Sequence, residues 1–194
     1  MTTITASMVN ELRQRTGASL MECKKALVEA SGDFDEAVVV LKKRGIASAE
    51  KKAGRDVSEG VIQAYIHPGA RVGVLLELKC ETDFVAKNEE FLRLARDIAM
   101  HIAAMAPKYV SPEDIPPEDI AKEREIAAGQ CLDKPAKAIE KIIEGKIAKW
   151  YGEQCLLQQP FVKNQEQSVE AYIREWISKI GENIKVSRFV RYQI

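Results

Sequence analysis

The first 46 residues carry three groups of hydrophobic positions, each repeating at the spacing of an amphipathic helix. The first group lies over residues 6–16, the second begins after Ser19 and the third begins after Asp33. Ser19 and Asp33 are expected to cap their helices, because short polar side chains accept hydrogen bonds from the free amides at a helix start. Gly17 and Gly45 stand where the first and third helices are expected to end. The sequence therefore predicts a small N-terminal three-helix bundle.

The rest of the chain mixes strand-like and helix-like patterns. Residues 47–56 are small and basic without an apolar stripe, and we interpret them as a mobile or weakly helical linker. Apolar alternation at 61–67 and 71–80, separated by three loop residues, is typical of an antiparallel hairpin, and a last alternation follows at 184–190. We expect residues 57–194 to form an antiparallel sheet core covered by helices, which makes the fold class α+β.

Four further helices are predicted within this core. One covers 89–105, a highly charged one covers 118–128, a third begins near Pro135, and the last is capped by Ser168. Several prolines between the first two of these helices indicate a surface connection with one capped turn. Residues 156–162 are interpreted as an extended, partly apolar arm.

The strand pattern changes to a helical repeat between Cys80 and Asn88, which predicts a strand-to-helix corner. Phe84 lies in this corner and belongs to neither apolar pattern. Connections between elements often carry function, whereas most aromatic side chains are simply buried. The pattern therefore leaves two interpretations open: Phe84 folds under the corner as a plug, or it is exposed for contact with a partner.

Composition and charge narrow the class of protein. Lys and Arg together number 29, as do Asp and Glu, so no overall field attracts nucleic acid or an anionic membrane. No apolar run is long enough to span a membrane, and the first residues lack the pattern of a secretory signal, so we expect a cytoplasmic protein. We expect a protein partner or a small ligand, with no nucleic acid and no membrane involved.

The chain lacks the motifs of phosphate-binding loops, dinucleotide sites, acyl transfer and zinc peptidases. His67 and His101 are too few and too far apart to indicate a metal site. The four cysteines are widely spaced without a Cys-x-x-Cys pair, and we expect free thiols. The sequence thus predicts no enzyme, no cofactor and no metal. The cysteines are Cys23, Cys80, Cys131 and Cys155.

Four motifs resemble the elongation factor Ts family. Residues 12–27 read LRQRTGASLMECKKAL, residues 82–87 read TDFVAK, residues 156–163 read LLQQPFVK and residues 180–184 read IGENI. They occur in order across nearly the whole chain, and together they are highly specific. The length is similar to that of the short bacterial form, in which one core repeat stands where longer members have two.

The resemblance implies a guanine-nucleotide exchange factor that promotes release of GDP from the GTPase elongation factor Tu in translation. It implies that residues 1–46 form a module similar to ubiquitin-associated domains, which docks on the nucleotide-binding domain of the partner. It further implies that the corner intrudes near the magnesium site of the partner, with Phe84 exposed. The docking candidates are Thr16, Gly17, Ala18, Ser19, Leu20 and Met21, and the intruding residues are Thr82, Asp83, Phe84 and Val85.

Two other classes of function are kept beside the exchange factor. One is a protein-binding adaptor that uses the three-helix module without changing nucleotide release. The other is a nucleic-acid-binding protein with salt-sensitive affinity, which the balanced charge disfavours. The short form of the family also implies a homodimer that replaces the missing repeat. The basic residues that would serve nucleic-acid binding are Lys42, Lys43, Arg44, Lys51, Lys52 and Arg55.

Overall fold

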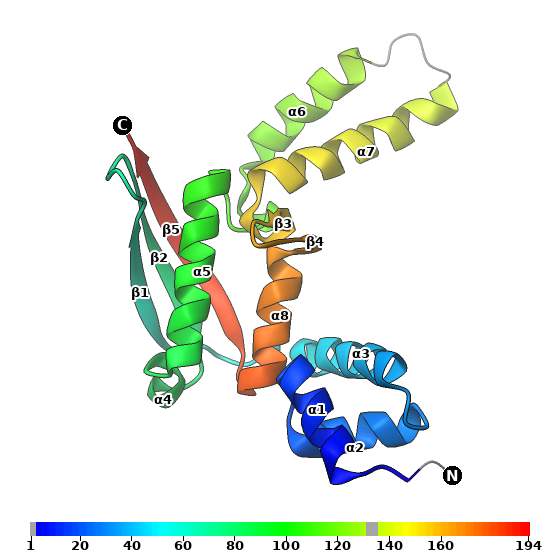
Figure 1. Cartoon of the computed structure of the whole chain (residues 1–194). Coiled ribbons are helices and arrows are strands. Elements are labelled where there is room, and N and C mark those ends of the chain that lie inside the picture. Colours follow the sequence, from blue (N-terminus) through cyan, green and yellow to red (C-terminus); the bar gives the residue numbers. More distant parts are fainter. Residues whose placement is uncertain (1–2, 131–135) are drawn as a thin grey trace. The chain divides into compact units, whose positions relative to one another are not determined.

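The computed structural model describes residues 3–130 and 136–194 (Figure 1). It divides into two compact units whose segments alternate along the sequence. The first unit combines Met1–Gly60, Lys79–Phe91 and Ile173–Lys185, and the second combines Val61–Leu78, Leu92–Tyr172 and Val186–Ile194.

Three helices open the first unit, as predicted. They are α1 (Ala6–Thr16), α2 (Leu20–Glu29) and α3 (Phe34–Lys52). Ser19 accepts a hydrogen bond from the Glu22 amide and Asp33 accepts one from the Glu36 amide, which confirms both predicted caps. The small core between the helices consists of Val9, Leu12, Cys23, Ala26, Leu27, Ala30 and Ala37.

The expected end of the third helix at Gly45 is wrong, because α3 continues to Lys52. A Cβ atom at Gly45 would lie 3.3 Å from the hydroxyl oxygen of Ser178. Glycine therefore serves close packing at this position, and residues 47–52 of the predicted linker form the last turns of the helix.

The sheet contains β1 (Glu59–Ile66), β2 (Val72–Cys80) and β5 (Ile184–Gln193) in the order β1-β2-β5. It confirms the predicted antiparallel hairpin and the return of the last strand to the sheet. Helix α5 (Glu89–Met105) lies along one face of the sheet (Figure 1). The buried side chains of β2 are Val74, Leu76, Leu78 and Cys80, and those of α5 include Phe91, Leu94, Ala95, Ile98 and Ile102. Met105, the last residue of α5, continues the apolar repeat of this helix but is 44% exposed.

Helices α6 (Pro117–Gly129) and α7 (Ala136–Gln154) pack against each other in the second unit, and the predicted capped turn before them is present at η1 (Pro112–Asp114). The arm expected at 156–162 is only partly extended, because it begins with a 3₁₀ turn, η2 (Leu156–Gln158). Strand β3 (Pro160–Phe161) then pairs with β4 (Asn164–Ser168). The pattern did not reveal β4 because all of its side chains are polar.

A buried histidine anchors this region of the second unit. The Nδ1 atom of His101 accepts a hydrogen bond from the Val162 amide at 3.1 Å, so its Nε2–H faces the Gln159 side-chain oxygen at 2.9 Å. Burial lowers the pKa of the imidazole. His101 is thus a neutral core residue, and the described residues contain no cluster of metal-ligating side chains.

Helix α8 (Val169–Ile180) precedes β5, and Ser168 caps it by accepting a bond from the Ala171 amide at 3.1 Å. Among the described residues, no helix is both long and apolar enough to cross a membrane. Three of the four predicted free thiols are confirmed as free and buried, whereas Cys131 lies outside the described residues. The three are Cys23, Cys80 and Cys155.

Candidate partner-binding site

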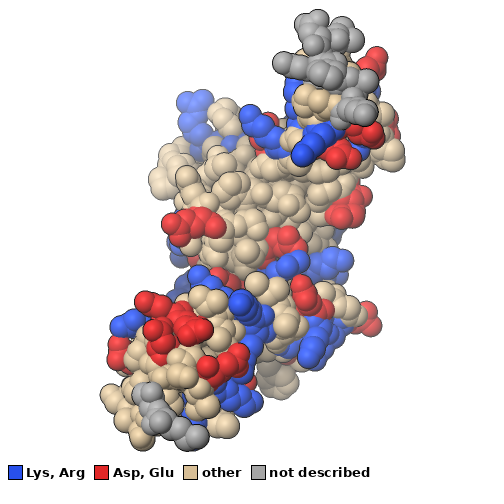
Figure 2. Space-filling model, turned by 90° about the vertical axis from the view of Figure 1, so that its right-hand side faces the viewer, with Lys and Arg blue, Asp and Glu red and all other residues tan. Residues whose placement is uncertain are grey.

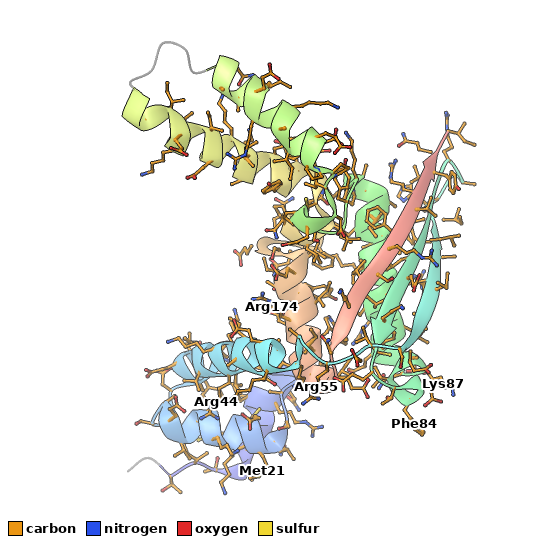
Figure 3. The ribbon with its side chains drawn as sticks, turned by 180° about the vertical axis from the view of Figure 1, so that it is seen from behind. Met21, Arg44, Arg55, Phe84, Lys87 and Arg174 are labelled. Atoms are coloured by element: carbon orange, nitrogen blue, oxygen red, sulfur yellow. The ribbon has the colours of Figure 1, made fainter. Side chains whose placement is uncertain are left out.

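The corner after β2 exposes the aromatic side chain that the sequence singled out. The single-turn helix α4 (Asp83–Ala86) begins here, and the hydroxyl of Thr82 caps it by accepting a hydrogen bond from the Val85 amide at 3.4 Å. Ala86 is the buried residue of this turn, whereas Phe84 is 81% exposed and points outward (Figure 3). The interpretation of Phe84 as a buried plug is therefore wrong.

A carboxylate from a distant part of the sequence holds the start of this corner. The Glu182 side chain accepts hydrogen bonds from the backbone amides of Glu81 and Thr82 at 3.1 and 3.0 Å. It also accepts one from the Thr82 hydroxyl at 2.6 Å. Hydrogen bonds to a charged acceptor are stronger than neutral ones, so this group fixes the backbone where the strand ends.

The residue that follows Glu182 ties the corner to the segment after α3. The Asn183 amide donates to the Glu81 carboxylate at 2.6 Å, and its side-chain nitrogen donates to the carbonyl oxygens of Ala53 and Arg55 at 3.3 and 2.8 Å. The Arg55 guanidinium lies 3.4 Å from the Glu81 carboxylate. Glu182 and Asn183 belong to the motif at 180–184, which resembles the family but indicates no role for either residue.

Cys80 supports the corner from inside. Its thiol donates to the Thr82 carbonyl oxygen at 3.2 Å. Burial, and next the nearby Glu182 carboxylate, raise the pKa of this thiol to about 11. A thiol of this kind stays protonated at neutral pH, so Cys80 acts as a packing residue.

Asp83 and Lys87 form an ion pair on the outside of α4, with 2.7 Å between the ammonium nitrogen and the carboxylate. The hydrogen bond from Lys87 lowers the pKa of the Asp83 carboxyl, and the same bond raises the pKa of Lys87. Both side chains are half or more exposed. The pair therefore keeps Asp83 ionised and oriented beside Phe84 and adds little to overall stability.

The predicted docking residues form the turn between α1 and α2. The Thr16 hydroxyl donates to the Leu12 carbonyl oxygen at 2.8 Å and accepts from the Ala18 amide at 3.4 Å. Gly17 follows with φ of 69°, the left-handed conformation that ends α1. The turn is thus shaped by hydrogen bonds between near neighbours, and the helix end at Gly17 is confirmed.

Two hydrophobic side chains project from the start of α2. Leu20 is 46% exposed and Met21 is 64% exposed. Ser19 caps the helix just before them, and Cys23 beneath the turn donates its thiol to the Ala18 carbonyl oxygen at 3.7 Å. The structure therefore places the docking candidates in one turn with exposed apolar side chains at its helical end.

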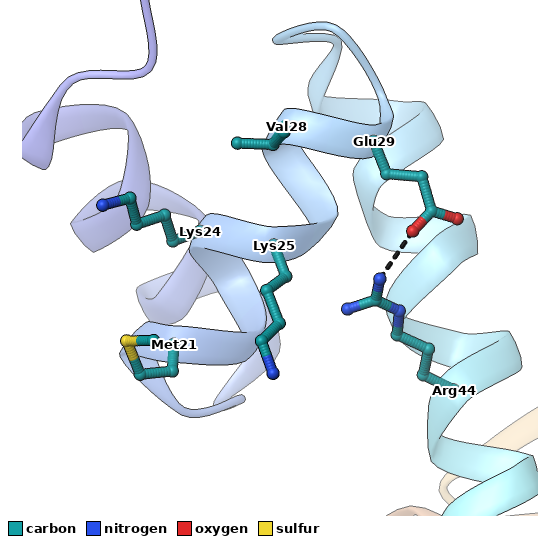
Figure 4. A pocket seen from close by; sticks show the side chains of 6 residues that line it. All are labelled: Met21, Lys24, Lys25, Val28, Glu29 and Arg44. Carbon is teal, nitrogen blue, oxygen red and sulfur yellow. Dashed lines mark hydrogen bonds and ion pairs between the residues drawn. The ribbon is translucent and has the colours of Figure 1, made fainter.

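Met21 also borders an open groove of about 400 Å³ (Figure 4). Arg44 spans the groove from α3 and pairs with Glu29 at 2.5 Å and with Glu22 at 3.3 Å. The face shown in Figure 2 mixes acidic and basic side chains, as the balanced composition predicts. The groove is lined by Met21, Lys24, Lys25, Val28, Glu29 and Arg44.

The chain is similar to one family of known proteins over almost its whole length. The family model described as elongation factor TS matches residues 3–194. Elongation factor Ts of Carboxydothermus hydrogenoformans is 55% identical over 193 residues, which cover 98% of this chain and 89% of the relative. Elongation factor Ts of Desulforamulus reducens is 54% identical over 196 residues, covering 100% and 90%, and that of Thermosipho melanesiensis is 56% identical over 193 residues, covering 98% of each.

Proposed function

The chain belongs to the elongation factor Ts family, and we propose that its corner, residues 82–85, drives the release of GDP from elongation factor Tu. Membership makes the chain a nucleotide exchange factor for elongation factor Tu in translation elongation, and not an enzyme. The cytoplasmic location, where translation takes place, belongs to the same proposal. So does the division of the chain into a module at 1–46, a linker at 47–56 whose first six residues continue α3, and a core at 57–194.

The exposure of Phe84 is the observation that supports the proposed mechanism. Phe84 is an aromatic side chain that is 81% exposed on a corner held by hydrogen bonds to Glu182. Moving this ring from water into an apolar crevice of the partner contributes about 1.5 to 3 kcal/mol. Leaving this ring in water is unfavourable, so its exposure supports a role for Phe84 in binding the partner.

Nucleotide binding by the partner is sensitive to the geometry of its magnesium site, at which we propose the corner acts. The ion bridges phosphate oxygens of the bound nucleotide and requires near-ideal octahedral geometry, so a small shift of its protein ligands weakens nucleotide binding. We assign this shift to Asp83 and Phe84, with Thr82 and Val85 forming the backbone that carries them. The phosphate-binding loop of the partner then loosens after the magnesium ion.

Docking is assigned to the turn at 16–21. Leu20 and Met21 supply exposed apolar surface, and Thr16, Gly17, Ala18 and Ser19 shape the turn that presents it. Linkage requires that the factor and the nucleotide weaken each other's binding by the same amount. Incoming nucleotide therefore releases the factor, and docking has to be of moderate strength.

We assign the homodimer to the outer face of the sheet in the second unit. This face is opposite α5, and Figure 1 shows no described helix on it. Five large apolar side chains are exposed there, a density that favours contact with a second copy. A monomeric mass by light scattering at working concentration would contradict this assignment. The five residues are Ile62, Ile66, Leu75, Val190 and Tyr192, which are 65%, 63%, 47%, 38% and 69% exposed.

The test is the rate at which fluorescent GDP leaves elongation factor Tu, measured by stopped flow. The wild-type chain is expected to accelerate release, and Phe84→Ala is expected to lose most of this acceleration while it still folds and still binds. If the wild-type chain binds but leaves the rate unchanged, the mechanism is wrong and the protein acts as an adaptor through its three-helix module.

A further inference from the structure

We infer that Glu182 is a positioning residue for nucleotide exchange, because its carboxylate holds the corner in the conformation that exposes Phe84. This inference rests on the proposed function and adds to it a residue that lies 100 positions away from Thr82 in the sequence. Glu182 is not one of the residues assigned to partner contact. Its effect is expected to pass entirely through the corner.

Glu182 replaces the hydrogen-bond partners that the strand loses at its end. Strand β2 ends at Cys80, and the next two amides, those of Glu81 and Thr82, point to the same Glu182 oxygen at 3.1 and 3.0 Å. The second oxygen accepts the Thr82 hydroxyl at 2.6 Å. One carboxylate thus accepts hydrogen bonds from three donors, and these bonds restrain the backbone conformation at Glu81 and Thr82.

The Thr82 hydroxyl connects Glu182 to the helical turn that contains Phe84. The Thr82 hydroxyl donates to Glu182 and at the same time accepts from the Val85 amide at 3.4 Å. The orientation of the hydroxyl therefore links the distant carboxylate to the first turn of α4. Because Phe84 lies within that turn, its direction depends on Glu182.

Asn183, the residue after Glu182, is itself held by hydrogen bonds to two other segments. Asn183 binds the carbonyl oxygens of Ala53 and Arg55 through its side chain, and its backbone amide donates to the Glu81 carboxylate at 2.6 Å. Asn183 is 5% exposed, so these bonds are shielded from water. Glu182 therefore acts from a fixed support.

A fixed corner has a functional advantage in exchange. A flexible corner loses conformational freedom when it enters the partner, and this loss weakens the intruding step. A hydrogen bond to a charged group changes a conformational equilibrium by about tenfold or more. Loss of Glu182 should therefore reduce the share of molecules whose corner is ready to intrude by about that factor.

Stopped-flow release of fluorescent GDP from elongation factor Tu, recorded over a range of factor concentrations, tests the inference. Glu182→Ala is expected to lower the maximal rate about tenfold or more, while the half-saturating concentration, which reports docking through the turn at 16–21, changes much less. Glu182→Gln keeps one oxygen acceptor for the two amides and should fall between the wild type and Glu182→Ala. Equal maximal rates for all three would overturn the inference.

A double-mutant cycle separates positioning from a general structural effect. If Glu182 acts through Phe84, Glu182→Ala should slow release in the wild-type background and have almost no further effect in the Phe84→Ala background. Additive losses in the cycle would contradict the inference. If the wild-type chain fails to accelerate release at all, the proposed function fails and this inference fails with it.

Asp97→Asn is the matched control. Asp97 is 9% exposed, and its carboxylate accepts bonds from Lys163 and Tyr172 at 2.7 and 3.0 Å, but it belongs to the second unit. This variant should change the thermal midpoint without the tenfold loss of rate. Amide hydrogen exchange of the free proteins should show faster exchange at Glu81 and Thr82 in Glu182→Ala and unchanged exchange there in Asp97→Asn. Unchanged exchange at both amides in Glu182→Ala would also overturn the inference.

Discussion

The turn at 16–21 and the corner at 82–85 share the same local chemistry. Neighbouring residues hold the turn, whereas residues distant in the sequence hold the corner. Each leads into a helix through a hydroxyl cap, Ser19 in the turn and Thr82 in the corner. Each exposes hydrophobic surface immediately after the cap. In each, a buried cysteine beneath the backbone donates its thiol to a carbonyl oxygen, Cys23 to Ala18 and Cys80 to that of its own corner.

The difference lies in the range of the hydrogen bonds. Those described for the turn join residues within 12–23, whereas the corner is held by Glu182 and Asn183 from the short connection between α8 and β5. A docking surface tolerates small movements, but a side chain that has to displace a metal ligand needs a defined direction. The long-range hydrogen bonds are therefore found at the corner, to which we assign the displacement of the metal ligands in the partner.

Leu12→Ala is expected to have the largest effect, and to act on the three-helix bundle that carries the turn and not on the corner. Leu12 is fully buried in the small core of the three-helix bundle, and its carbonyl oxygen also receives the Thr16 hydroxyl. Removing a buried leucine side chain costs about 2 to 5 kcal/mol. Amide hydrogen exchange should show loss of protection in α1 and α2, with the amides of Glu81 and Thr82 still protected.

Leu20→Ala is the control with the same chemical change at an exposed position. Leu20 is 46% exposed, so its truncation should alter the free energy of unfolding by about 0.5 kcal/mol or less while weakening docking. Equal destabilisation by Leu12→Ala and Leu20→Ala would show that the bundle does not depend on its interior core.

The same substitution at the two caps gives the next largest difference. Ser19→Ala removes one cap bond and should lower the free energy of unfolding by about 1 kcal/mol. Thr82→Ala removes the cap of α4 and also the bond to Glu182, so a loss of about 2 to 3 kcal/mol is expected. Urea unfolding of both variants measures the two values. Equal losses would mean that the long-range bond at the corner adds no stability.

Sequence patterns predicted what is encoded locally. The caps at Ser19 and Asp33, the hairpin of β1 and β2, and the start of α5 after Asn88 all follow from residue spacing and turn chemistry. The exposure of Phe84 did not, because most aromatic side chains are buried and the pattern around Phe84 gives no sign that this one is exposed. The resemblance to a family decided that point before the structure confirmed it.

What the patterns missed depends on partners that are distant in the sequence. Gly45 looked like a helix end, but its environment is set by Ser178, which no local pattern reveals. Glu182 and Asn183 belong to a family motif, but their role depends on where the fold brings Glu81 and Thr82. Residues 164–168 form a strand by pairing with Phe161 and its neighbour, although they have no apolar alternation.

Gly17→Ala examines the local geometry of the turn and should have a smaller effect. A φ of 69° costs a residue with a Cβ atom about 1 to 2 kcal/mol. A Cβ atom there would also lie 3.3 Å from the Lys179 side chain, which is flexible and can move aside. Gly145→Ala is the matched control with the opposite sign, because Gly145 lies within α7 with open space around it and should gain about 0.5 to 1 kcal/mol. Thermal unfolding that shifts both variants in the same direction would contradict this reading.

The smallest expected effect is that of low pH, which should weaken the ion pair at the corner and leave the hydrogen bonds of the turn unchanged. Lys87 lowers the pKa of Asp83 from its ordinary value of 3.8, so the pair stabilises the fold fully above that value. This contribution is lost as the pH falls through the lower pKa of the folded state. The hydroxyls of Thr16 and Ser19 do not titrate in this range. NMR titration of the Asp83 carboxyl should therefore give a lower midpoint in the wild type than in Lys87→Met, and identical midpoints would show that the ion pair does not orient Asp83 in solution.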